Sequence, residues 1–352
     1  MVHPLARDLD HVLAHTPSIW DAVRGRRVFI TGGTGFVGTW LVESFVWANE
    51  RLNLNARLIV LTRDPEAFCK KAPHAARHPS VEFLHREAAL FDFPRGEFPF
   101  VIHAATERAF EPTPLHPAGT FDLDIEATRH VLEFARTHGT ARLLFTSSGA
   151  VYGRQPPDLT HIPEEYPGAP LTTDPSSAYG QAKRVSEFLC SMYARQFGFE
   201  AVIARLFAFA GPHLPLDLNF AIGNFVRDVL RGGPVSIAGD GTPFRSYLYA
   251  ADLAIWLWTL LLRGRSARPY NVGSGEDLSI AALAQAVVRN TCPEIPIEIA
   301  GTPVPGAPAS RYVPSVERAR AEFGLTPLVG LDEGIRRMYD WNLKHGLRKF
   351  TP

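Results

Sequence analysis

The sequence predicts an α/β fold: a doubly wound parallel sheet with a smaller α/β lobe near the C-terminus. Three observations lead to this prediction. The stretch "RRVFITGGTGFVGTWLVESFVWA" (26–48) runs from a β-branched segment through a glycine turn into an amphipathic helix. Further apolar runs follow at intervals of about one helix, as in a parallel sheet with helical crossovers. Runs such as "FVIHAA" are apolar almost throughout, which is typical of strands covered on both faces.

The elements expected from this pattern can be placed in order along the chain. Residues 1–25 form an N-terminal helical extension, because Asp8, Leu9, Val12 and Leu13 recur at helical spacing. A helix ending at Gly139 is expected before the fifth strand. Strands are expected at residues 28–30, 56–61, 81–87, 100–105 and 141–147.

The texture of the sequence changes after the fifth strand. Residues 153–175 are rich in proline and polar side chains, as expected of a surface loop that lines a site. The helix "SSAYGQAKRVSEFLCSMYARQFG" and the strand "EAVIARLF" then return to the sheet. We therefore expect residues 26–212, with the return of 246–265, to form a nucleotide-binding domain of the Rossmann type. Residues 213–245 and 266–345 are expected to form the smaller, substrate-binding lobe.

Composition and charge narrow the functional classes. The 352 residues carry 36 basic and 36 acidic side chains, and this balance argues against a nucleic-acid partner. Three widely separated cysteines favour a reducing cytoplasm over a disulfide framework or a thiolate zinc site. The histidines show no metal-ligand spacing, so no metal is expected.

Neither a signal peptide nor a membrane span is expected. The first twenty residues mix acidic and apolar side chains and lack the basic-then-apolar order of a signal peptide. The longest apolar run, "LAIWLWTLLL" (253–262), is half the length of a membrane span. We interpret it as a buried helix.

The glycine turn indicates a dinucleotide site. Gly32, Gly35 and Gly38 stand directly after a strand and at the start of a helix. Such spacing allows a tight turn, close approach of the backbone to a pyrophosphate and close packing of helix on strand. The first N–H groups of the helix, at Phe36, Val37 and Gly38, would then face the phosphates.

The end of the second strand bears on the choice between NAD and NADP. NAD sites usually place an acid there for the ribose hydroxyls, whereas NADP sites place a cation near the 2′-phosphate. This strand ends in Thr62 and Arg63, and Asp64 follows one step later. Arg63 favours NADP, with NAD binding through Asp64 as the alternative. Glu87, at the end of the third strand, is a candidate partner for the adenine amino group.

The segment "YGQAK" places Tyr179 and Lys183 four residues apart on one helical face. A tyrosine acts as a general acid or base near neutral pH when its pKa falls, and a neighbouring ammonium together with the positive nicotinamide ring lowers it by stabilising the phenolate. Lys183 can also hold the nicotinamide ribose. Such a pair is common on helix surfaces, but here it follows a dinucleotide turn and a strand that ends in serines.

At this point the chain resembles the extended short-chain dehydrogenase/reductases, the nucleotide-sugar epimerase/dehydratase group. The motifs "TGGTGFVG", "VIHAA", "SSGAVYG", "SAYGQAK" and "NVGSGEDLSI" occur in the family's order, and the resemblance covers about residues 26–345. It implies that Tyr179 transfers the proton, that Lys183 assists it and that Ser148 orients the substrate oxygen. It also implies that Ala104 and Ala105 contact the cofactor and that Ser147 contacts the substrate.

The resemblance extends to the substrate's diphosphate. In "GDGTPFRSYLYAADLA", Arg245 stands where family members hold the nucleotide diphosphate, and Arg311 in "SRYVPS" resembles a second such contact. A planar guanidinium suits two phosphate oxygens. Two departures stand out. Ala208 replaces a frequent asparagine, for which Asn219 and Asn224 are the candidate substitutes, and Asp124 replaces another asparagine and is interpreted as structural.

The departure that bears most on the reaction lies in "TSSGAVYG". By the resemblance, sugar 4,6-dehydratases carry a Thr-Asp-Glu triplet at Ser148-Gly149-Ala150, and sugar-acid decarboxylases keep a glutamate in place of Ala150. Loss of a general acid typically costs about 10²–10⁴ in rate. A dehydratase would need a carboxylate from elsewhere, such as Glu164 or Glu165.

These observations favour a nucleotide-sugar 4-epimerase that retains its nicotinamide and passes through a 4-keto intermediate. The alternative is a reductase of 4-keto-6-deoxy nucleotide sugars that consumes NADPH, which Arg63 favours. Less favoured are a 4,6-dehydratase, a reductase of non-sugar carbonyl compounds and a non-catalytic NADP-binding regulator. The presence of Ser148, Tyr179 and Lys183 argues against the last.

The resemblance also implies a homodimer in which two helices from each subunit form a four-helix bundle. The helices would be "IEATRHVLEFAR" and "AKRVSEFLCSMYAR". The apolar positions that would serve either this interface or the core are Val131, Leu132, Phe134, Val185, Phe188 and Leu189.

Overall fold

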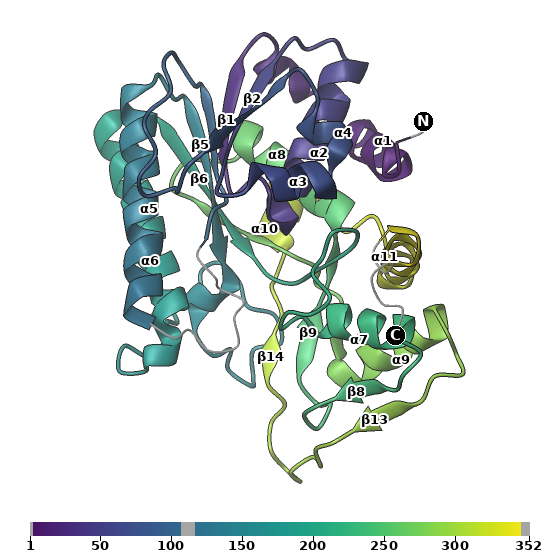
Figure 1. The fold of residues 1–352 in the computed structure, drawn as a ribbon. Coiled ribbons are helices and arrows are strands. Elements are labelled where there is room, and N and C mark those ends of the chain that lie inside the picture. The colour runs from purple at the N-terminus through teal and green to yellow at the C-terminus, as the bar shows by residue number, and fades with distance from the viewer. Residues whose placement is uncertain (1–2, 107–116, 346–352) are drawn as a thin grey trace.

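The computed structural model describes residues 3–106 and 117–345. In this part of the chain a seven-stranded parallel sheet forms the centre of the molecule (Figure 1). Its strand order is β11-β6-β5-β4-β1-β2-β3, so the direction of winding reverses between β1 and β4. Ligands in such sheets bind at the carboxyl edge beside this switch point. The strands are β1 Arg27–Thr31, β2 Arg57–Thr62, β3 Val81–His85, β4 Phe100–His103, β5 Arg142–Ser148, β6 Glu200–Leu206 and β11 Pro269–Val272.

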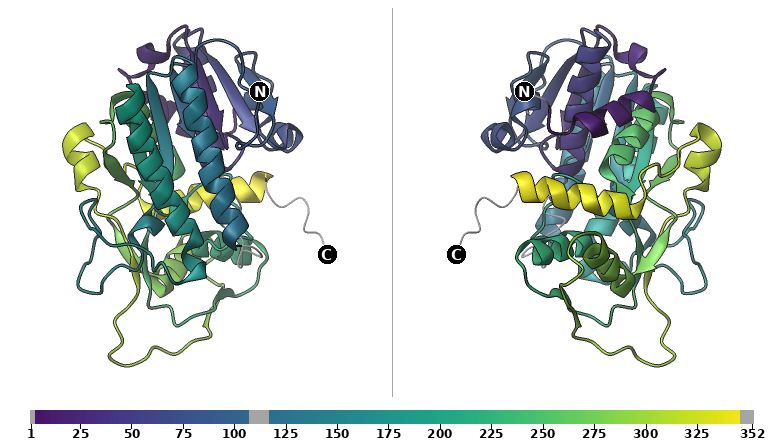
Figure 2. Two further views of the ribbon diagram at one scale, coloured as in Figure 1. Left: turned by 90° about the vertical axis from the view of Figure 1, so that its left-hand side faces the viewer. Right: turned by 90° about the vertical axis from the view of Figure 1, so that its right-hand side faces the viewer.

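Helices cover both faces of the sheet. On one face lie α2 (Phe36–Arg51) and α8 (Ala250–Arg263), and on the other α5 (Pro117–Thr137) and α6 (Ala178–Phe197), which run side by side (Figure 2). Alternate residues of β1 enter the two cores, since Val28 and Ile30 pack with α2 and Phe29 packs with α5. The predicted α/β class and doubly wound parallel sheet are therefore confirmed.

The apolar run at 253–262 forms most of α8, whose residues from Ala250 to Leu261 are all buried. It lies between the sheet and the N-terminal helix α1 (Ala6–Ala14), which explains why no polar face is needed. Within the described ranges, none of the helices combines the length and the apolar character that crossing a membrane requires.

The N-terminal extension is fastened to the later part of the chain. The Tyr249 hydroxyl donates to Asp8 over 2.8 Å, and Arg337 forms an ion pair with the same carboxylate. His11 lies 3.0 Å from Asp252 at the start of α8. Since Asp8 is buried, these partners satisfy a charge that would otherwise be costly.

The smaller lobe lies below the main sheet in Figure 1 and has its own core. It contains helices α7 (Ala221–Leu230), α9 (Ile280–Asn290) and α11 (Leu331–His345). Three short strands form its sheet in the order β12-β9-β14: β12 Asp277–Ser279, β9 Phe244–Ser246 and β14 Arg311–Tyr312. A second pair joins β8 (Val235–Ile237) to β13 (Ile297–Ile299).

The sequence places residues 266–345 in the smaller lobe, but β11 belongs to the main sheet. Residues 269–272 pair in parallel with β6, and Tyr270 and Val272 are fully buried there. This strand lies at the edge of the sheet, and two buried apolar side chains are enough to fix it there. A run of four residues is too short for its pattern to show whether it belongs to the main sheet or to the smaller lobe. Helix α10 (Glu317–Phe323) packs beside it.

The remaining described elements are short. Helices α3 (Pro65–Lys71) and α4 (Pro73–Ala76) follow β2, and the strands β7 (Phe209–Ala210) and β10 (Leu248–Tyr249) form a separate parallel pair. Single 3₁₀ turns occupy Trp20–Val23, Gly149–Tyr152 and Pro175–Ser177.

Candidate active site

The glycine turn between β1 and α2 has the shape of a phosphate cradle. Gly32 has φ +70°, and a Cβ there would lie 2.5 Å from the backbone of Ala104 and Ala105. A Cβ on Gly38 would lie 2.2 Å from the Gly32 carbonyl oxygen, so turn and helix are in direct contact. Gly35 meets nothing closer than 3.5 Å, which leaves room above it. The turn thus fits the close approach of a pyrophosphate.

Helix α2 starts at Phe36, and no side chain caps its N-terminus. The first N–H groups of a helix have no partners within the helix and lie at its positive end. The sequence places Phe36, Val37 and Gly38 at this point, and the structure agrees with that placement. These residues together with the turn would hold the diphosphate of a dinucleotide.

At the end of β2, the structure shows the surroundings of Asp64 and Arg63, the two residues that bear on the choice between NAD and NADP. Asp64 caps helix α3 by accepting the Ala67 N–H over 2.8 Å, so its carboxylate already has a structural partner. The Thr62 hydroxyl lies 3.0 Å from that of Thr34 in the glycine turn. Arg63 is exposed at the same edge.

Sequence reasoning missed a second cation beside the turn. The Lys71 ammonium, at the last position of α3, donates to the Thr34 carbonyl oxygen over 3.2 Å. Burial lowers the pKa of Lys71 to about 8. No motif marks this lysine, because the end of a short helix after the strand carries it to the turn.

Glu87 follows the end of β3 and is exposed. It lines a small hollow that Ala105, Thr106 and Asp124 also line. The structure therefore brings the candidate adenine contact to the same edge of the sheet as the "VIHAA" alanines.

The catalytic candidates meet at the carboxyl end of β5. Ser148 is the last residue of this strand, and its hydroxyl accepts the Ala150 N–H over 3.1 Å. Tyr179 and Lys183 lie one turn apart near the start of α6, with the ammonium 5.7 Å from the tyrosine ring centre. Ser148 is among the groups that lower the pKa of Tyr179, so its hydroxyl lies close to the phenol. Lys183 donates to the Thr146 carbonyl oxygen over 3.4 Å, and the structure thus brings all three side chains together.

Burial dominates the electrostatics of this group. It raises the pKa of Tyr179 above its ordinary value, and the nearby Ser148 hydroxyl only partly opposes this shift. Burial lowers the pKa of Lys183, while the nearby Asp124 carboxylate opposes that shift. Desolvation of the phenolate is the largest effect among this chain's own groups, so the lowered tyrosine pKa, which the expectation ascribes to Lys183 together with the nicotinamide ring, stays a prediction.

Asp124, interpreted from the sequence as structural, also acts on the catalytic pair. It is buried in α5 and accepts the Thr106 hydroxyl over 3.1 Å. Its carboxylate raises the pKa of both Tyr179 and Lys183. It therefore supplies a negative charge to the catalytic centre.

Gly149, where the resemblance gives dehydratases an aspartate, has no space for a larger side chain. A Cβ on Gly149 would lie 2.7 Å from the Phe207 ring and 2.7 Å from the Tyr312 hydroxyl oxygen. A carboxylate side chain at this position therefore has no room. Ala150 adds only a methyl group. Tyr312 and Phe207 come from distant parts of the chain, and sequence reasoning did not find them.

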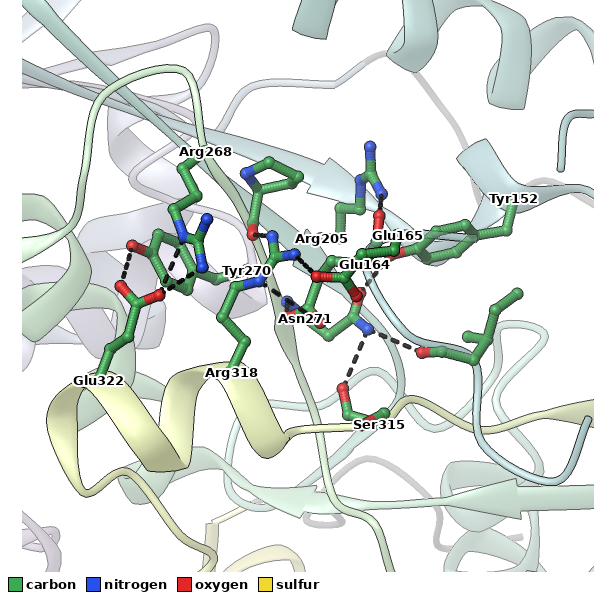
Figure 3. A network of polar contacts seen from close by, with 12 residues as sticks. Tyr152, Glu164, Glu165, Arg205, Arg268, Tyr270, Asn271, Ser315, Arg318 and Glu322 are labelled. Carbon is green, nitrogen blue, oxygen red and sulfur yellow. Dashed lines mark hydrogen bonds and ion pairs between the residues drawn. The ribbon is translucent and has the colours of Figure 1, made fainter. Parts of the chain in front are cut away.

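Glu164 and Glu165, the alternative carboxylates, contact Asn271 and Arg318 (Figure 3). Glu164 accepts the Asn271 N–H over 2.9 Å and lies 3.9 Å from Arg318, and Glu165 forms an ion pair with the same arginine. Burial raises the pKa of Glu164. Both carboxylates therefore join the loop after β5 to β11 and α10.

The small sheet β12-β9-β14 separates the two candidate diphosphate arginines. Arg245 pairs across the strands with Tyr312, so the two share a face, and the guanidinium lies 5.9 Å from the tyrosine ring centre. Arg311 pairs with Phe244 on the opposite face, where it forms a 2.5 Å ion pair with Asp277 and covers the Phe244 ring at 4.2 Å. The structure thus places Arg245 on the catalytic side and does not support a diphosphate role for Arg311.

Two other substrate candidates also differ from expectation. Ser147 is buried and donates to Glu187, which is also ion-paired with Arg205. Its side chain points away from Ser148 because successive strand residues face opposite ways. Asn219 is exposed in the loop before α7, while the Asn224 amide donates to the Leu216 and Leu218 carbonyls and shapes that loop.

Similarity to known proteins agrees with this site. UDP-glucuronic acid decarboxylase 3 of Arabidopsis thaliana is 30% identical over 315 residues, covering 89% of this chain and 87% of that protein. The UDP-glucose 4-epimerase of Thermus thermophilus, solved with NAD, is 26% identical with a TM-score of 0.72, and 90% and 98% of the chains are covered. The UDP-glucose 4-epimerase of Thermotoga maritima shares the fold, with 22% identity, a TM-score of 0.75 and 90% and 99% covered. Residues 28–273 match the model of one family, and the chain belongs to it: the NAD dependent epimerase/dehydratase family.

Proposed function

We propose that this NAD(P)-dependent enzyme is a nucleotide-sugar epimerase of the 4-epimerase type, which passes through a 4-keto sugar. The observation that carries the proposal is the closed acid position. Ser148, Tyr179 and Lys183 are assembled, while Phe207 and Tyr312 fill the space that a side chain on Gly149 would need. Proton transfer at a carbinol is therefore supported, and elimination of water lacks its usual acid.

The roles of the residues follow from their chemistry. The nicotinamide, when bound, takes up and returns the hydrogen of the sugar carbon as hydride. Tyr179 exchanges the hydroxyl proton, Ser148 binds the oxygen that carries it, and the Lys183 ammonium stabilises the phenolate. Arg245, on the same face as Tyr312, would bind the diphosphate of the sugar nucleotide.

Decarboxylation deserves a direct comparison because similar proteins carry that name. The resemblance noted above gives sugar-acid decarboxylases a glutamate where this chain has Ala150. Glu164 and Glu165 are held by Asn271 and Arg318 and do not substitute for it. We therefore expect the enzyme to return the sugar with all its carbon atoms.

The test is an assay of the purified full-length protein with UDP-, dTDP-, CDP- and GDP-sugars, including UDP-glucuronate. Absorbance and mass spectrometry first show whether NAD(H) is retained. Interconversion of a sugar nucleotide with its C4 epimer, with no net consumption of cofactor, supports the proposal. Release of CO₂ or water from the substrate as the main reaction contradicts it.

A second candidate is an NADPH-dependent reductase of 4-keto-6-deoxy nucleotide sugars. Two observations favour it. Asp64 is occupied as a helix cap, while Arg63 and Lys71 supply cations at this edge of the sheet for a 2′-phosphate. The raised pKa of Tyr179 suits a phenol that donates a proton to a ketone. An enzyme purified without cofactor that oxidises added NADPH with such a substrate would establish this function instead.

We also propose the homodimer through α5 and α6 and a cytoplasmic location. Of the six apolar positions named above, Val131, Leu132, Phe134 and Leu189 are core residues, Val185 is partly buried against the same core, and Phe188 is exposed. Leu123, Met192 and Phe197 are exposed on the same two helices. Sedimentation of the protein should show a dimer, and Phe188→Asp should weaken it. A monomer at all concentrations would contradict the dimer.

A further inference from the structure

Glu187 is a buried carboxylate that the proposed mechanism does not use. It lies on α6, one turn beyond Lys183 and two turns beyond Tyr179, so the three side chains share one stripe of the helix. Only 8% of the residue is exposed. A charged group at this depth is costly unless it is paired and hydrogen-bonded. Its partners therefore bear on its role.

Two neighbouring strands supply those partners. The Ser147 hydroxyl of β5 donates to one carboxylate oxygen of Glu187 over 2.5 Å. Arg205 of β6 donates to both oxygens, over 2.9 and 2.7 Å, and so forms a bidentate pair. Ser147 and Arg205 are direct partners in the register of the two strands, so one carboxylate joins both strands to the helix.

The helix has a second contact with β5 at the preceding residue of the strand. Lys183 donates to the Thr146 carbonyl oxygen over 3.4 Å, while Glu187 binds the Ser147 side chain. Two successive residues of β5 are thus joined to two successive turns of α6, and Ser148 follows directly in the strand. These contacts fix the place of the catalytic tyrosine, at the start of the helix, relative to this serine.

The arginine of the pair is itself held on other sides. Its guanidinium lies 4.6 Å from the Tyr152 ring centre and donates to the Glu164 carbonyl oxygen over 3.4 Å (Figure 3). The side chains of Arg205 and Glu187 are only 13% and 11% exposed. Solvent therefore screens the pair little, and its geometry is set before a substrate binds.

We propose that Glu187 is a positioning residue: its carboxylate clamps α6 onto β5 and β6 and thereby holds the catalytic end of that helix against Ser148. This assignment rests on the proposed function, in which Tyr179 and Lys183 carry out the proton transfer. Ser147, which the resemblance assigns to the substrate, instead joins the clamp to the catalytic strand. A misplacement of about 1 Å between reacting groups can lower a rate about a hundredfold.

The first test is Ser147→Ala, which removes the contact with β5 and leaves the ion pair of Glu187 with Arg205. It should lower kcat by about fivefold to tenfold, with little change in the KM for the sugar nucleotide or in cofactor affinity. Tyr193→Phe is the matched control, because this hydroxyl, also on α6, donates to Glu133 of α5 over 2.6 Å. It should lower the thermal midpoint and leave kcat unchanged.

The second test removes the clamp without leaving a buried charge unpaired. Replacing both members of a buried ion pair by apolar residues is often neutral or stabilising, so Glu187→Met combined with Arg205→Met should keep the thermal midpoint near the wild-type value. Its kcat should fall by about tenfold or more. Adding Ser147→Ala should then cause no further loss of kcat, because the serine has already lost its partner.

The assignment is overturned by wild-type kcat in the paired-methionine variant or by a further loss when Ser147→Ala is added to it. If the paired variant does not fold, Ser147→Ala and its control still decide, since a purely structural clamp would lower the thermal midpoint and leave kcat unchanged. Failure of the proposed function appears differently: the wild-type enzyme would then turn over none of the tested sugar nucleotides, and the assignment would fall with it.

Discussion

The two halves of the sheet's carboxyl edge are built in different ways. The cofactor half depends on one continuous stretch, from Thr31 through the turn to the first turn of α2, with Ala104 and Ala105 packed against it. The substrate half is assembled from β5, α6, the end of β6 and β14. A site built from one continuous segment can be predicted from residue spacing in the sequence. A site assembled from distant segments cannot, because its shape depends on which side chains the fold brings together.

The largest effect is expected from Tyr179→Phe. Removing a general acid–base group should lower kcat by about 10²–10⁴, while NAD(P) binding stays intact. Stopped-flow or steady-state turnover together with fluorescence titration of the cofactor measures both. If Tyr179→Phe lowered turnover and cofactor binding equally, the cofactor half and the substrate half would not act independently.

A matched pair of glycine substitutions sharpens the comparison. Gly32→Ala introduces a Cβ 2.5 Å from backbone atoms at φ +70°, so it should impair cofactor binding and cost about 1–3 kcal/mol of stability. Gly149→Ala meets the Phe207 and Tyr312 side chains, so it should impair turnover and leave cofactor binding intact. Calorimetric titration with NAD(P) and activity assays distinguish the two. If Gly32→Ala impaired only turnover and Gly149→Ala impaired cofactor binding, the division of the carboxyl edge into a cofactor half and a substrate half would be wrong.

The two arginines of the small sheet should behave differently. Arg245→Ala is expected to raise the KM for the sugar nucleotide by about tenfold, the loss of one charge-assisted hydrogen bond. Arg311→Ala removes an ion pair with Asp277 on the other face and should leave KM near the wild-type value. A larger KM effect for Arg311→Ala would restore the role that the sequence suggested.

The smallest effect concerns Lys71 in the cofactor half. Its pKa of about 8 means that the ammonium is charged below this pH and loses its charge as the pH rises through it. Affinity for NADP should therefore weaken above about pH 8, and Lys71→Met should flatten this dependence and weaken binding by about twofold to fivefold at pH 7. A pH dependence that persists unchanged in the variant would assign it to another group.

The sequence predicted best those features that depend on residues close together along the chain. Six of the seven strands of the sheet, the buried helix at 253–262 and the glycine turn follow from runs of apolar residues and from glycine spacing, whereas β11 does not. Tyr179 and Lys183 were found because a helix brings residues four apart to one face.

What the sequence did not reveal depends on register and on side-chain partners. Arg245 and Arg311 look alike in sequence, but alternation along a short strand pair sends them to opposite faces. Ser147 looked as available as Ser148, yet Glu187 binds its hydroxyl within the core. Lys71 belongs to no motif, and Tyr312 stands in "SRYVPS" only as the neighbour of Arg311, because tertiary contacts carry both residues to the site.

The position of Tyr312 late in the chain has a consequence for the order in which the enzyme folds. Ser148 and Tyr179 leave the ribosome long before the strand that carries Tyr312, and that strand pairs only with β9 of the smaller lobe. Contacts between such distant segments form late in folding, since the chain must first close a long loop. A chain whose main sheet has formed but whose small sheet has not would bind the dinucleotide, but the space beside Gly149 that Tyr312 fills would still be open. Activity is thereby delayed until the last part of the fold is in place.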